Sequence, residues 1–245
     1  MNDGYAPAGN DWIFYRESGS GEAVLFIHAG VADSRMWVRQ LESVPDGFRF
    51  VAYDQRGFGN TELGSGPFKD HEDVIALMDN LGIDRATLVG CSMGAGIALD
   101  LAIASPERVA GLVLVGAASP GFEPEDEFEP PQWPEAVAAF KAGDFERVAQ
   151  LDAEIWLFGQ GRDEHRLDPE LVELFLEMDL KALRQETERD ERRAEGPDRA
   201  NGIRGIQVPT LVVVGEHDLP DLLEHAHHLT ERLSRRAAVV VEDAA

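Results

Sequence analysis

Short apolar segments alternate with helical patterns along the first 115 residues, and this alternation restricts the fold more than any other feature of the chain. The apolar segments are nearly continuous, as in strands that are buried on both faces of a parallel sheet. The expected strands are Asp11–Arg16, Ala23–His28, Phe48–Asp54, Arg85–Val89 and Val109–Val115. The helices expected between them are Ser34–Val44, Phe68–Leu81 and Gly94–Ala104. The pattern therefore predicts an α/β fold, a mostly parallel twisted sheet flanked by helices.

The alternation is interrupted between residues 120 and 205. The interruption begins at Phe122–Pro134, which holds five acidic residues and four prolines and is typical of a loop or hinge. Two amphipathic helices with proline-containing starts are expected after it, at Pro134–Phe158 and Pro169–Glu191. Within the second stretch, the Arg/Glu-rich run Glu186–Glu195 indicates a solvated helix face.

The α/β pattern then resumes. A strand is expected at Pro209–Val214, a helix at Pro220–Ser234 and a last strand at Ala237–Val241. The simplest arrangement is a core built from residues 1–119 and 206–245, with a helical cap of residues 120–205 inserted after the strand at 109–115.

The charge balance of the chain is strongly acidic. It has 46 Asp and Glu against 22 Lys and Arg, which gives a formal net charge of −24. Because such a surface repels phosphate backbones and anionic lipids, we expect a small-molecule partner and no nucleic-acid or membrane partner. The composition favours no particular oligomeric state.

Several features are typical of a cytoplasmic protein. The one cysteine, Cys91, excludes a disulfide within the chain and fits a reducing compartment. The N-terminus lacks the basic and apolar regions of a signal peptide. No apolar stretch approaches the roughly 18 to 20 residues of a membrane span. We therefore expect a cytoplasmic location.

The strongest functional signal is the segment Gly90-Cys91-Ser92-Met93-Gly94, which matches the pattern G-x-S-x-G. It lies directly after an expected strand and directly before an expected helix, the context that the motif requires. The glycines permit a sharp turn that presents the serine hydroxyl, and the helix N-terminus offers N–H groups to a developing oxyanion. The motif predicts a nucleophilic serine, with Cys91 as a small buried neighbour that points away from the hydroxyl.

Further motifs in the expected order make the chain resemble the α/β-hydrolase superfamily, in its cap-bearing serine esterase and lactonase-like branch. The resemblance covers nearly the whole chain. The family patterns H-G-x, D-x-R-G-x-G, P-E-R-V and G-x-x-D are similar to His28-Ala29-Gly30, Asp54-Gln55-Arg56-Gly57-Phe58-Gly59, Ser105-Pro106-Glu107-Arg108-Val109 and Gly215-Glu216-His217-Asp218.

The resemblance implies a role for each matching residue. Ser92 would be the nucleophile, and Asp218 would be the acid that orients the general base. The backbone N–H groups of Gly30 and Met93 would form the oxyanion hole, although Ala29 stands where the family usually has a glycine. This chemistry requires no organic cofactor and no metal ion, so we expect neither.

The general base is missing from its expected position. In the family, the catalytic histidine lies on a loop after the last strand and a closing helix follows, whereas here only Glu242-Asp243-Ala244-Ala245 follows Ala237–Val241. The histidines of the sequence are His28, His71, His165, His217, His225, His227 and His228. His217 is adjacent to Asp218, but neighbouring residues at a strand end point in opposite directions. We therefore expect the chain to be a truncated form of a longer hydrolase that lacks this C-terminal loop and helix.

The substrate pocket is expected between Ser92 and the inserted cap. The residues expected to line it are His28, Trp37, Trp156, Phe158, Leu174, Phe175 and Met178.

Three functions are compatible with these residues. The leading hypothesis is a serine hydrolase that cleaves a small ester, lactone or thioester through an acyl-enzyme on Ser92. A carbon–carbon hydrolase or a cofactor-free perhydrolase would use the same residues. The third is a catalytically impaired or non-catalytic homologue that binds a small molecule, which the missing base favours.

Overall fold

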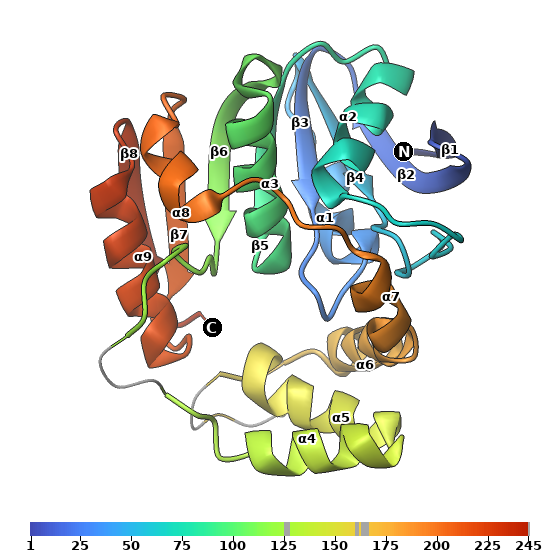
Figure 1. Ribbon diagram of the computed structural model, residues 1–245, viewed down its shortest axis with the longest axis vertical. Coiled ribbons are helices and arrows are strands. Elements are labelled where there is room, and N and C mark those ends of the chain that lie inside the picture. Colours follow the sequence, from blue (N-terminus) through green and yellow to red (C-terminus); the bar gives the residue numbers. More distant parts are fainter. Residues whose placement is uncertain (125–127, 160–161, 163–166, 245) are drawn as a thin grey trace.

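The computed structural model describes residues 1–124, 128–159, 162 and 167–244. Their strands form one sheet in the order β1-β2-β4-β3-β5-β6-β7-β8 (Figure 1). The strands are β1 Asn2–Ala8, β2 Asp11–Gly19, β3 Glu22–Ile27, β4 Phe48–Tyr53, β5 Ala86–Cys91, β6 Val109–Val115, β7 Thr210–Gly215 and β8 Arg236–Val241.

The sheet is antiparallel only on its N-terminal side. β1 pairs antiparallel with β2, and β2 pairs antiparallel with β4. The pairs from β4 through β3, β5, β6 and β7 to β8 are all parallel. The carboxyl ends of these parallel strands therefore meet at one edge, where ligands bind in open α/β sheets. This topology confirms the predicted α/β fold with a mostly parallel sheet flanked by helices.

β1 is absent from the strands expected from the sequence. It pairs with β2 from Asn2 opposite Glu17 to Ala8 opposite Asp11. Its inward side chains are small, with Ala6 fully buried, and the strand contains glycine and proline. This strand forms because its backbone pairs with the edge strand β2, and it contains no apolar run. The hydrophobic pattern therefore could not reveal it.

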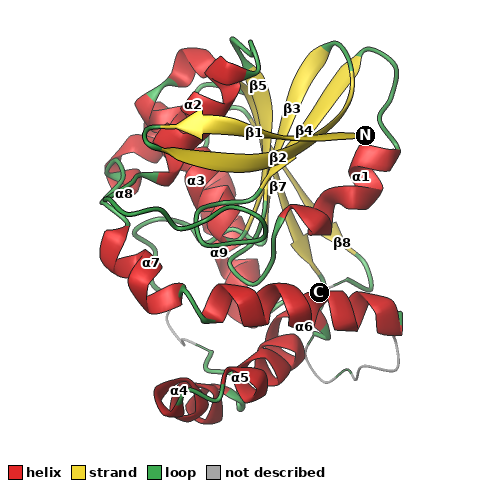
Figure 2. Ribbon diagram, turned by 90° about the vertical axis from the view of Figure 1, so that its right-hand side faces the viewer, coloured by secondary structure: helices red, strands yellow, loops and turns green. Residues whose placement is uncertain are grey.

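Helices cover the two faces of the sheet unequally (Figure 2). α2, α3 and α9 pack on one face, over a large core cluster that includes Leu25 and Ile27 of β3. The other face carries α1 and a small cluster in which Phe26 packs on Trp37 and Leu41. These core helices are α1 Val38–Glu42, preceded by the short turn η1 Ser34–Trp37, α2 Asp70–Asn80, α3 Met93–Ala104 and α9 Pro220–Arg232.

Further helices lie between β6 and β7, within the predicted cap. They are α4 Trp133–Ala142, α5 Phe145–Asp152, the π-helical turn η3 Ala153–Leu157, α6 Pro169–Leu183, α7 Glu186–Arg192 and α8 Arg199–Gly202. Figure 1 places α4, α5 and α6 beyond the carboxyl edge of the parallel strands. Within the described residues, no helix is both long and apolar enough to cross a membrane.

Each of the two long cap helices expected from the sequence is broken in the structure. Gly143 ends α4 in the left-handed region, at φ 75°. Asp144 then begins α5 by accepting a hydrogen bond from the Arg147 N–H at 3.2 Å. A glycine at a C-cap signals the end of one helix, and an aspartate at the following N-cap signals the start of the next. The amphipathic pattern continues across both residues, so the sequence suggested one long helix. The second expected helix divides into α6 and α7 at Gln185.

Candidate active site

Ser92 lies in the single-residue turn between β5 and α3. Its backbone adopts φ 50° and ψ −113°, a conformation that side chains other than glycine rarely adopt. Its N–H donates to the Val115 carbonyl at 2.8 Å, and its carbonyl accepts from the Ala95 N–H at 2.9 Å. Backbone pairing on both sides therefore holds the serine at the carboxyl edge of the sheet.

The two glycines of the motif are required by close packing of the backbone. A Cβ on Gly94 would lie 2.3 Å from the carbonyl oxygen of Ile27, and one on Gly90 would lie 2.3 Å from that of Gly94. Neither neighbour is a flexible side chain, so relief would require the strand and helix to separate. The glycines thus let α3 pack directly against β3 and β5 and set the sharpness of the Ser92 turn.

The predicted oxyanion donors lie beside this turn. Met93 is the first residue of α3, so no intrahelical acceptor serves its N–H. Gly30 follows β3 in the loop opposite, where a Cβ on Gly30 would lie 3.8 Å from Met93 Sδ. Both residues line the same cavity as Ser92. Ala29 keeps ordinary backbone angles and packs its methyl group near Met178, so the loop accommodates alanine there.

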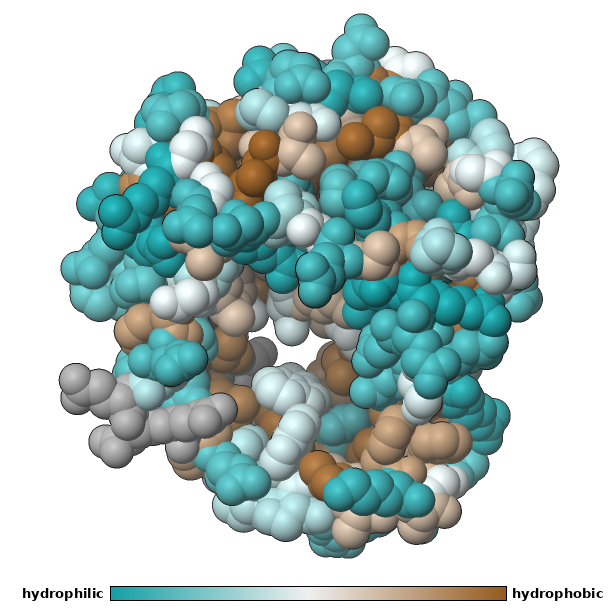
Figure 3. Space-filling model, viewed as in Figure 1, coloured by the Kyte–Doolittle hydropathy of each residue, from teal (hydrophilic) through white to brown (hydrophobic). Residues whose placement is uncertain are grey.

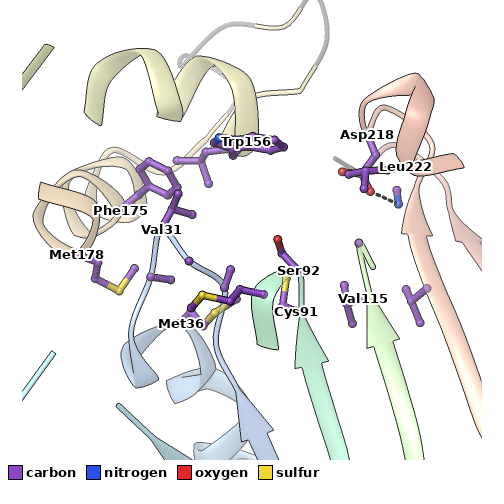
Figure 4. Close-up of a pocket in the computed structure, with 18 of the residues that line it drawn as sticks. Val31, Met36, Cys91, Ser92, Val115, Trp156, Phe175, Met178, Asp218 and Leu222 are labelled. Atoms are coloured by element: carbon purple, nitrogen blue, oxygen red, sulfur yellow. Dashed lines mark hydrogen bonds between the residues drawn. The ribbon is translucent and has the colours of Figure 1, made fainter. Parts of the chain in front are cut away.

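Asp218 lies between β7 and α9, at the same edge of the sheet as Ser92. Its Oδ2 accepts a hydrogen bond from the Gly215 N–H at 2.7 Å. Burial raises the pKa of the Asp218 carboxyl, and the bond from Gly215 opposes that effect. Figure 4 shows Ser92 and Asp218 on opposite sides of one cavity, with the carboxylate bound to the backbone of its own loop.

The described histidines do not reach this cavity. The Nε2 atom of His217 lies 3.8 Å from carboxylate oxygens of Glu216 and Asp243, and the backbone N–H of His217 donates to the Ala244 carbonyl. His225 and His228 both contact Ser119, and His225 Nδ1 accepts a hydrogen bond from the Ser119 backbone N–H at 3.1 Å. His165 lies outside the described residues. Among the described residues that line the cavity, none is a histidine.

His28 was expected in the pocket, and the structure corrects this. The side chain is fully buried beneath the oxyanion loop. Nδ1 donates to the Ala29 carbonyl at 2.8 Å, and Nε2 accepts from the Gln55 N–H at 3.0 Å. Burial lowers the pKa of His28, which keeps the ring neutral and able to accept the second bond. Its role is to brace two loops.

The cavity has a volume of about 1310 Å³ and lies between the cap and the carboxyl edge of the sheet. Figure 3 shows the molecule hollowed at this place. Of the residues expected in the pocket, Trp156, Leu174, Phe175 and Met178 line this cavity. Trp37 and Phe158 are not among the described lining residues, which corrects two further expectations. Trp37 packs on Phe26, with ring centroids 5.2 Å apart. Phe158 lies two residues from Trp156 in a helical turn, and residues at that spacing face different sides.

Sequence reasoning missed several residues of the cavity wall. Val31, Met36 and Leu222 line the cavity near Ser92 in Figure 4. A polar end of the wall is formed by Arg193, whose Nε lies 2.9 Å from Asp70 Oδ2 and whose Nη2 lies 3.5 Å from Met93 Sδ.

The run Glu186–Glu195 is not wholly a solvated face, contrary to expectation. Arg193 lines the cavity, and Arg189 is buried with its guanidinium 4.1 Å from the centre of the Phe58 ring. Alternating charges along a helix suggest solvent exposure on both sides. The aromatic ring that covers Arg189 comes from a loop distant in sequence, so only the fold reveals this contact.

Cys91 was expected to be a small buried residue that points away from the hydroxyl, but it is half-buried and lines the cavity beside Ser92. Burial raises the pKa of its thiol from an ordinary 9.0 to about 12. The thiol is therefore protonated at neutral pH. No cluster of three or more potential metal ligands was found in the part of the chain that the structure describes.

Comparison with known proteins agrees with this geometry. Residues 22–245 match the family model described as alpha/beta hydrolase fold. The chain is 29% identical over 225 residues to 3-oxoadipate enol-lactonase 2 from Acinetobacter baylyi, covering 90% of this chain and 80% of the relative. It is 37% identical over 112 residues to 2-hydroxy-6-oxo-6-phenylhexa-2,4-dienoate hydrolase from Comamonas testosteroni, covering 42% and 39%.

A similar fold occurs in a solved structure. The crystal structure of the enol-lactonase from Burkholderia xenovorans LB400 superposes with a TM-score of 0.77 at 26% identity. The match covers 99% of this chain and 92% of that one. With the family model matching most of its length, the chain belongs to the α/β-hydrolase fold family.

Proposed function

We propose that the protein is a serine hydrolase that cleaves an ester, lactone or thioester through an acyl-enzyme on Ser92. The observation that carries this proposal is the backbone of Ser92, held at φ 50° where β5 enters α3, with the side chain in a cavity that Asp218 shares. Strained backbone at a cavity wall is typical of a residue placed for function. The enol-lactonase similarities support ester or lactone chemistry.

The proposed reaction begins with attack of Ser92 Oγ on the carbonyl carbon of the substrate. The negative charge on the carbonyl oxygen is stabilised by the N–H groups of Gly30 and Met93. Collapse expels the alcohol or thiol, which takes up a proton, and leaves the acyl group on Ser92. Water then attacks the acyl-enzyme and releases a carboxylic acid.

The proton of Ser92 needs an acceptor, and in the proposed mechanism Asp218 orients a histidine for this purpose. None of the described cavity residues is a histidine. We therefore propose that acylation by this chain is slow, with the oxyanion donors and substrate binding supplying the acceleration.

The shape of the cavity favours a substrate with a substantial apolar group. A volume of about 1310 Å³ exceeds the range of about 300–1000 Å³ that is usual for ligand pockets. The wall around Ser92 is formed by aliphatic, aromatic and sulfur-containing side chains, among them Val31, Met36 and Phe175. An uncharged substrate would also avoid repulsion from the acidic surface.

A test of the proposal compares the chain with Ser92→Ala. With p-nitrophenyl butyrate, we expect release of p-nitrophenol by the chain and only the buffer rate with the variant. Ser234→Ala is a matched control, because Ser234 lies outside the cavity and donates to the Ile206 carbonyl. A fluorophosphonate probe should label the peptide that contains Ser92. Equal rates for the chain and Ser92→Ala would refute the proposal.

Two other functions retain support from specific observations. Carbon–carbon hydrolysis would use the same residues, and the similarity to the Comamonas hydrolase favours it. Ligand binding without turnover is favoured by the cavity wall, in which no described residue is a histidine. Saturable binding of an apolar ester, measured by calorimetry without product release, would select the binding function.

A further inference from the structure

A row of polar side chains runs along one side of α9. Asp221, His225, His228 and Arg232 follow one another at intervals of four, three and four residues, which places them on one face of a helix. We call these four residues the polar face of α9. Each of them contacts the part of the chain that leads from β6 into the cap.

The polar face of α9 holds the entry segment of the cap, which we define as residues 116–122. His225 Nδ1 accepts a hydrogen bond from the Ser119 backbone N–H at 3.1 Å, and His228 Nδ1 lies 2.9 Å from Ser119 Oγ. One turn further along the helix, Arg232 Nη1 donates to the Pro120 carbonyl at 2.6 Å. Because Ser119 is buried, its N–H and hydroxyl group need these partners from the protein. Two consecutive residues of the entry segment are thus held at three atoms.

Phe122 completes this contact. Its ring stacks on the His228 imidazole, with centroids 4.3 Å apart and an angle of 19° between the planes. It meets the His225 ring edge-on, with centroids 5.3 Å apart. The aromatic contacts hold both imidazole rings in the orientation that presents Nδ1 to Ser119. At the start of the helix, Asp221 Oδ2 accepts a further hydrogen bond from the Phe128 N–H at 2.8 Å.

The entry segment also forms part of the cavity wall. Gly116, Ala118 and Pro120 line the cavity, and Ser119 lies between the last two with its side chain turned to α9. Figure 4 shows Leu222 of α9 on the same side of the cavity as Asp218. Because both neighbours of Ser119 lie in the wall, a displacement of Ser119 from α9 would change the shape of the cavity.

The contacts of the polar face of α9 respond differently to a proton. His225 Nδ1 accepts from a backbone N–H, so protonation of Nδ1 would place two donors face to face and break the bond. His228 faces a hydroxyl group, which can donate to a neutral ring or accept from a protonated one. Arg232 is charged throughout and donates to a carbonyl. The contact of His225 is therefore the one in this pair of imidazoles that acid would remove.

The surroundings of His225 favour its neutral form at neutral pH. Burial lowers the pKa of the ring; Asp221 opposes this effect, His228 adds to it and Glu224 opposes it. From the entry segment the ring meets uncharged groups, an N–H and an aromatic ring, and the acidic residue that follows this segment, Glu123, is exposed. The strand β7, on which α9 packs, contains no charged residue.

We propose that the polar face of α9 is a latch for the entry segment of the cap, closed while His225 is neutral and loosened when His225 Nδ1 takes up a proton. In the loosened state the Ser119 N–H loses its acceptor, and Ala118 and Pro120 shift within the cavity wall. His225 is then a positioning residue that acts through Ser119. This role is separate from the proposed hydrolase reaction, because it concerns the shape of the cavity and requires no turnover.

The test measures hydrogen exchange of the Ser119 amide by NMR between about pH 5 and pH 8. The result is expressed as a protection factor, which removes the intrinsic pH dependence of exchange. We expect protection to fall about tenfold as the pH falls through this range, as for the loss of one hydrogen bond. The methyl signal of Ala118, which lines the cavity, should shift with the same midpoint.

Three variants separate the latch from a general effect of acid. His225→Asn should keep the amide protected at every pH, because its amide oxygen can accept in place of Nδ1 and does not titrate. His225→Phe keeps an aromatic ring but no acceptor, so protection should be low at every pH. This second variant keeps the test available if the first fails to fold. His227→Asn, the same change at an exposed position of α9, should behave as the full chain does.

A second measurement follows the equilibrium constant for unfolding. The pKa of His225 is lowered in the folded chain, so the folded state binds fewer protons than the unfolded state just below the ordinary value of 6.5. The contribution of His225 to stability is therefore complete above about pH 6.5 and is lost as the pH falls through the lowered pKa. His225→Asn should flatten this slope, and His227→Asn should not. Protection of Ser119 that is independent of pH in the full chain, a fall that persists in His225→Asn, or an Ala118 signal that does not follow the fall would overturn the proposal.

Discussion

Ser92 and Asp218 stand at the same edge of one sheet, but the two turns that carry them are held in different ways. The Ser92 turn is fixed by backbone packing. Neighbouring backbone atoms leave no room for a Cβ at Gly90 or Gly94, and the φ of Ser92 is 50°. The Asp218 turn is longer, and its carboxylate binds the Gly215 N–H. In the first turn the main chain determines where the functional group lies, and in the second a side chain does. Substitutions should therefore affect folding at the first turn and chemistry at the second.

The largest effect on stability is expected for Gly94→Ala. The added methyl group would lie 2.3 Å from the Ile27 carbonyl oxygen, so β3 and α3 must separate. We expect the free energy of unfolding to fall by about 3 kcal/mol, as for overpacked cores. Urea denaturation measures it. Gly205→Ala is the control, because a Cβ there meets nothing within 4 Å and should leave stability unchanged or slightly higher. Equal stability of the two variants would contradict the packing account.

Asp218→Asn should show the opposite behaviour. The amide oxygen can still accept from the Gly215 N–H, and removal of a carboxylate whose pKa is raised by burial relieves a desolvation cost. We expect stability to be unchanged, while any Ser92-dependent kcat/KM falls to the extent that Asp218 acts through a base. Steady-state kinetics and thermal unfolding of the same sample separate the two effects. Loss of stability without loss of rate would assign Asp218 a structural role.

The thiol beside Ser92 offers a third comparison, since the same turn that presents the hydroxyl places Cys91 half-buried in the cavity wall. A pKa raised from 9.0 to about 12 lowers the thiolate fraction about a thousandfold. We expect Ellman's reagent to react with the folded chain about a thousandfold more slowly than with the chain in guanidinium. Cys91→Ala provides the blank, because the sequence has one cysteine. Rapid labelling of the folded chain would show that the thiol is exposed and ionised.

The smallest effect on stability is expected for Ser92→Gly. Glycine adopts positive φ without steric cost, so this change removes the strain of a serine at φ 50° but adds some chain entropy to the unfolded state. We expect a net gain of about 1 kcal/mol in the free energy of unfolding together with loss of Ser92-dependent hydrolysis. Ser92→Ala keeps the strain and should gain nothing. Destabilisation by Ser92→Gly would mean that the turn is not strained.

The sequence predicted the parts of the molecule that depend on local pattern. The buried strands, the Ser92 turn and the position of Asp218 after β7 all follow from apolar runs and glycines that lie close together in the chain. The pocket was predicted less well. Trp37 and His28 face inward because of partners such as Phe26 and Gln55 from other strands and loops, and a single sequence does not show those partners.

The cap shows the same limit. The break at Gly143 carries a local signal in its glycine and the aspartate that follows. The burial of Asp152, Asp179 and Arg189 has no such signal, because each charged residue is covered by a segment distant in sequence. Charged side chains are mostly exposed, so a pattern-based prediction places them in solvent.

The contacts of α6 and α7 with the loop at residues 54–59 also have a mechanical consequence. Arg189 rests on Phe58, and Lys181 donates to the Gly59 carbonyl, so this end of the cap is anchored to the core. α4 and α5 extend away from the sheet (Figure 1). On the other side of the cavity, the Phe128 N–H donates to Asp221 of α9, and Arg162 pairs with Asp243 after β8. The inserted helices are therefore held to the core at two separate places, and the width of the cavity between those places depends on both sets of contacts.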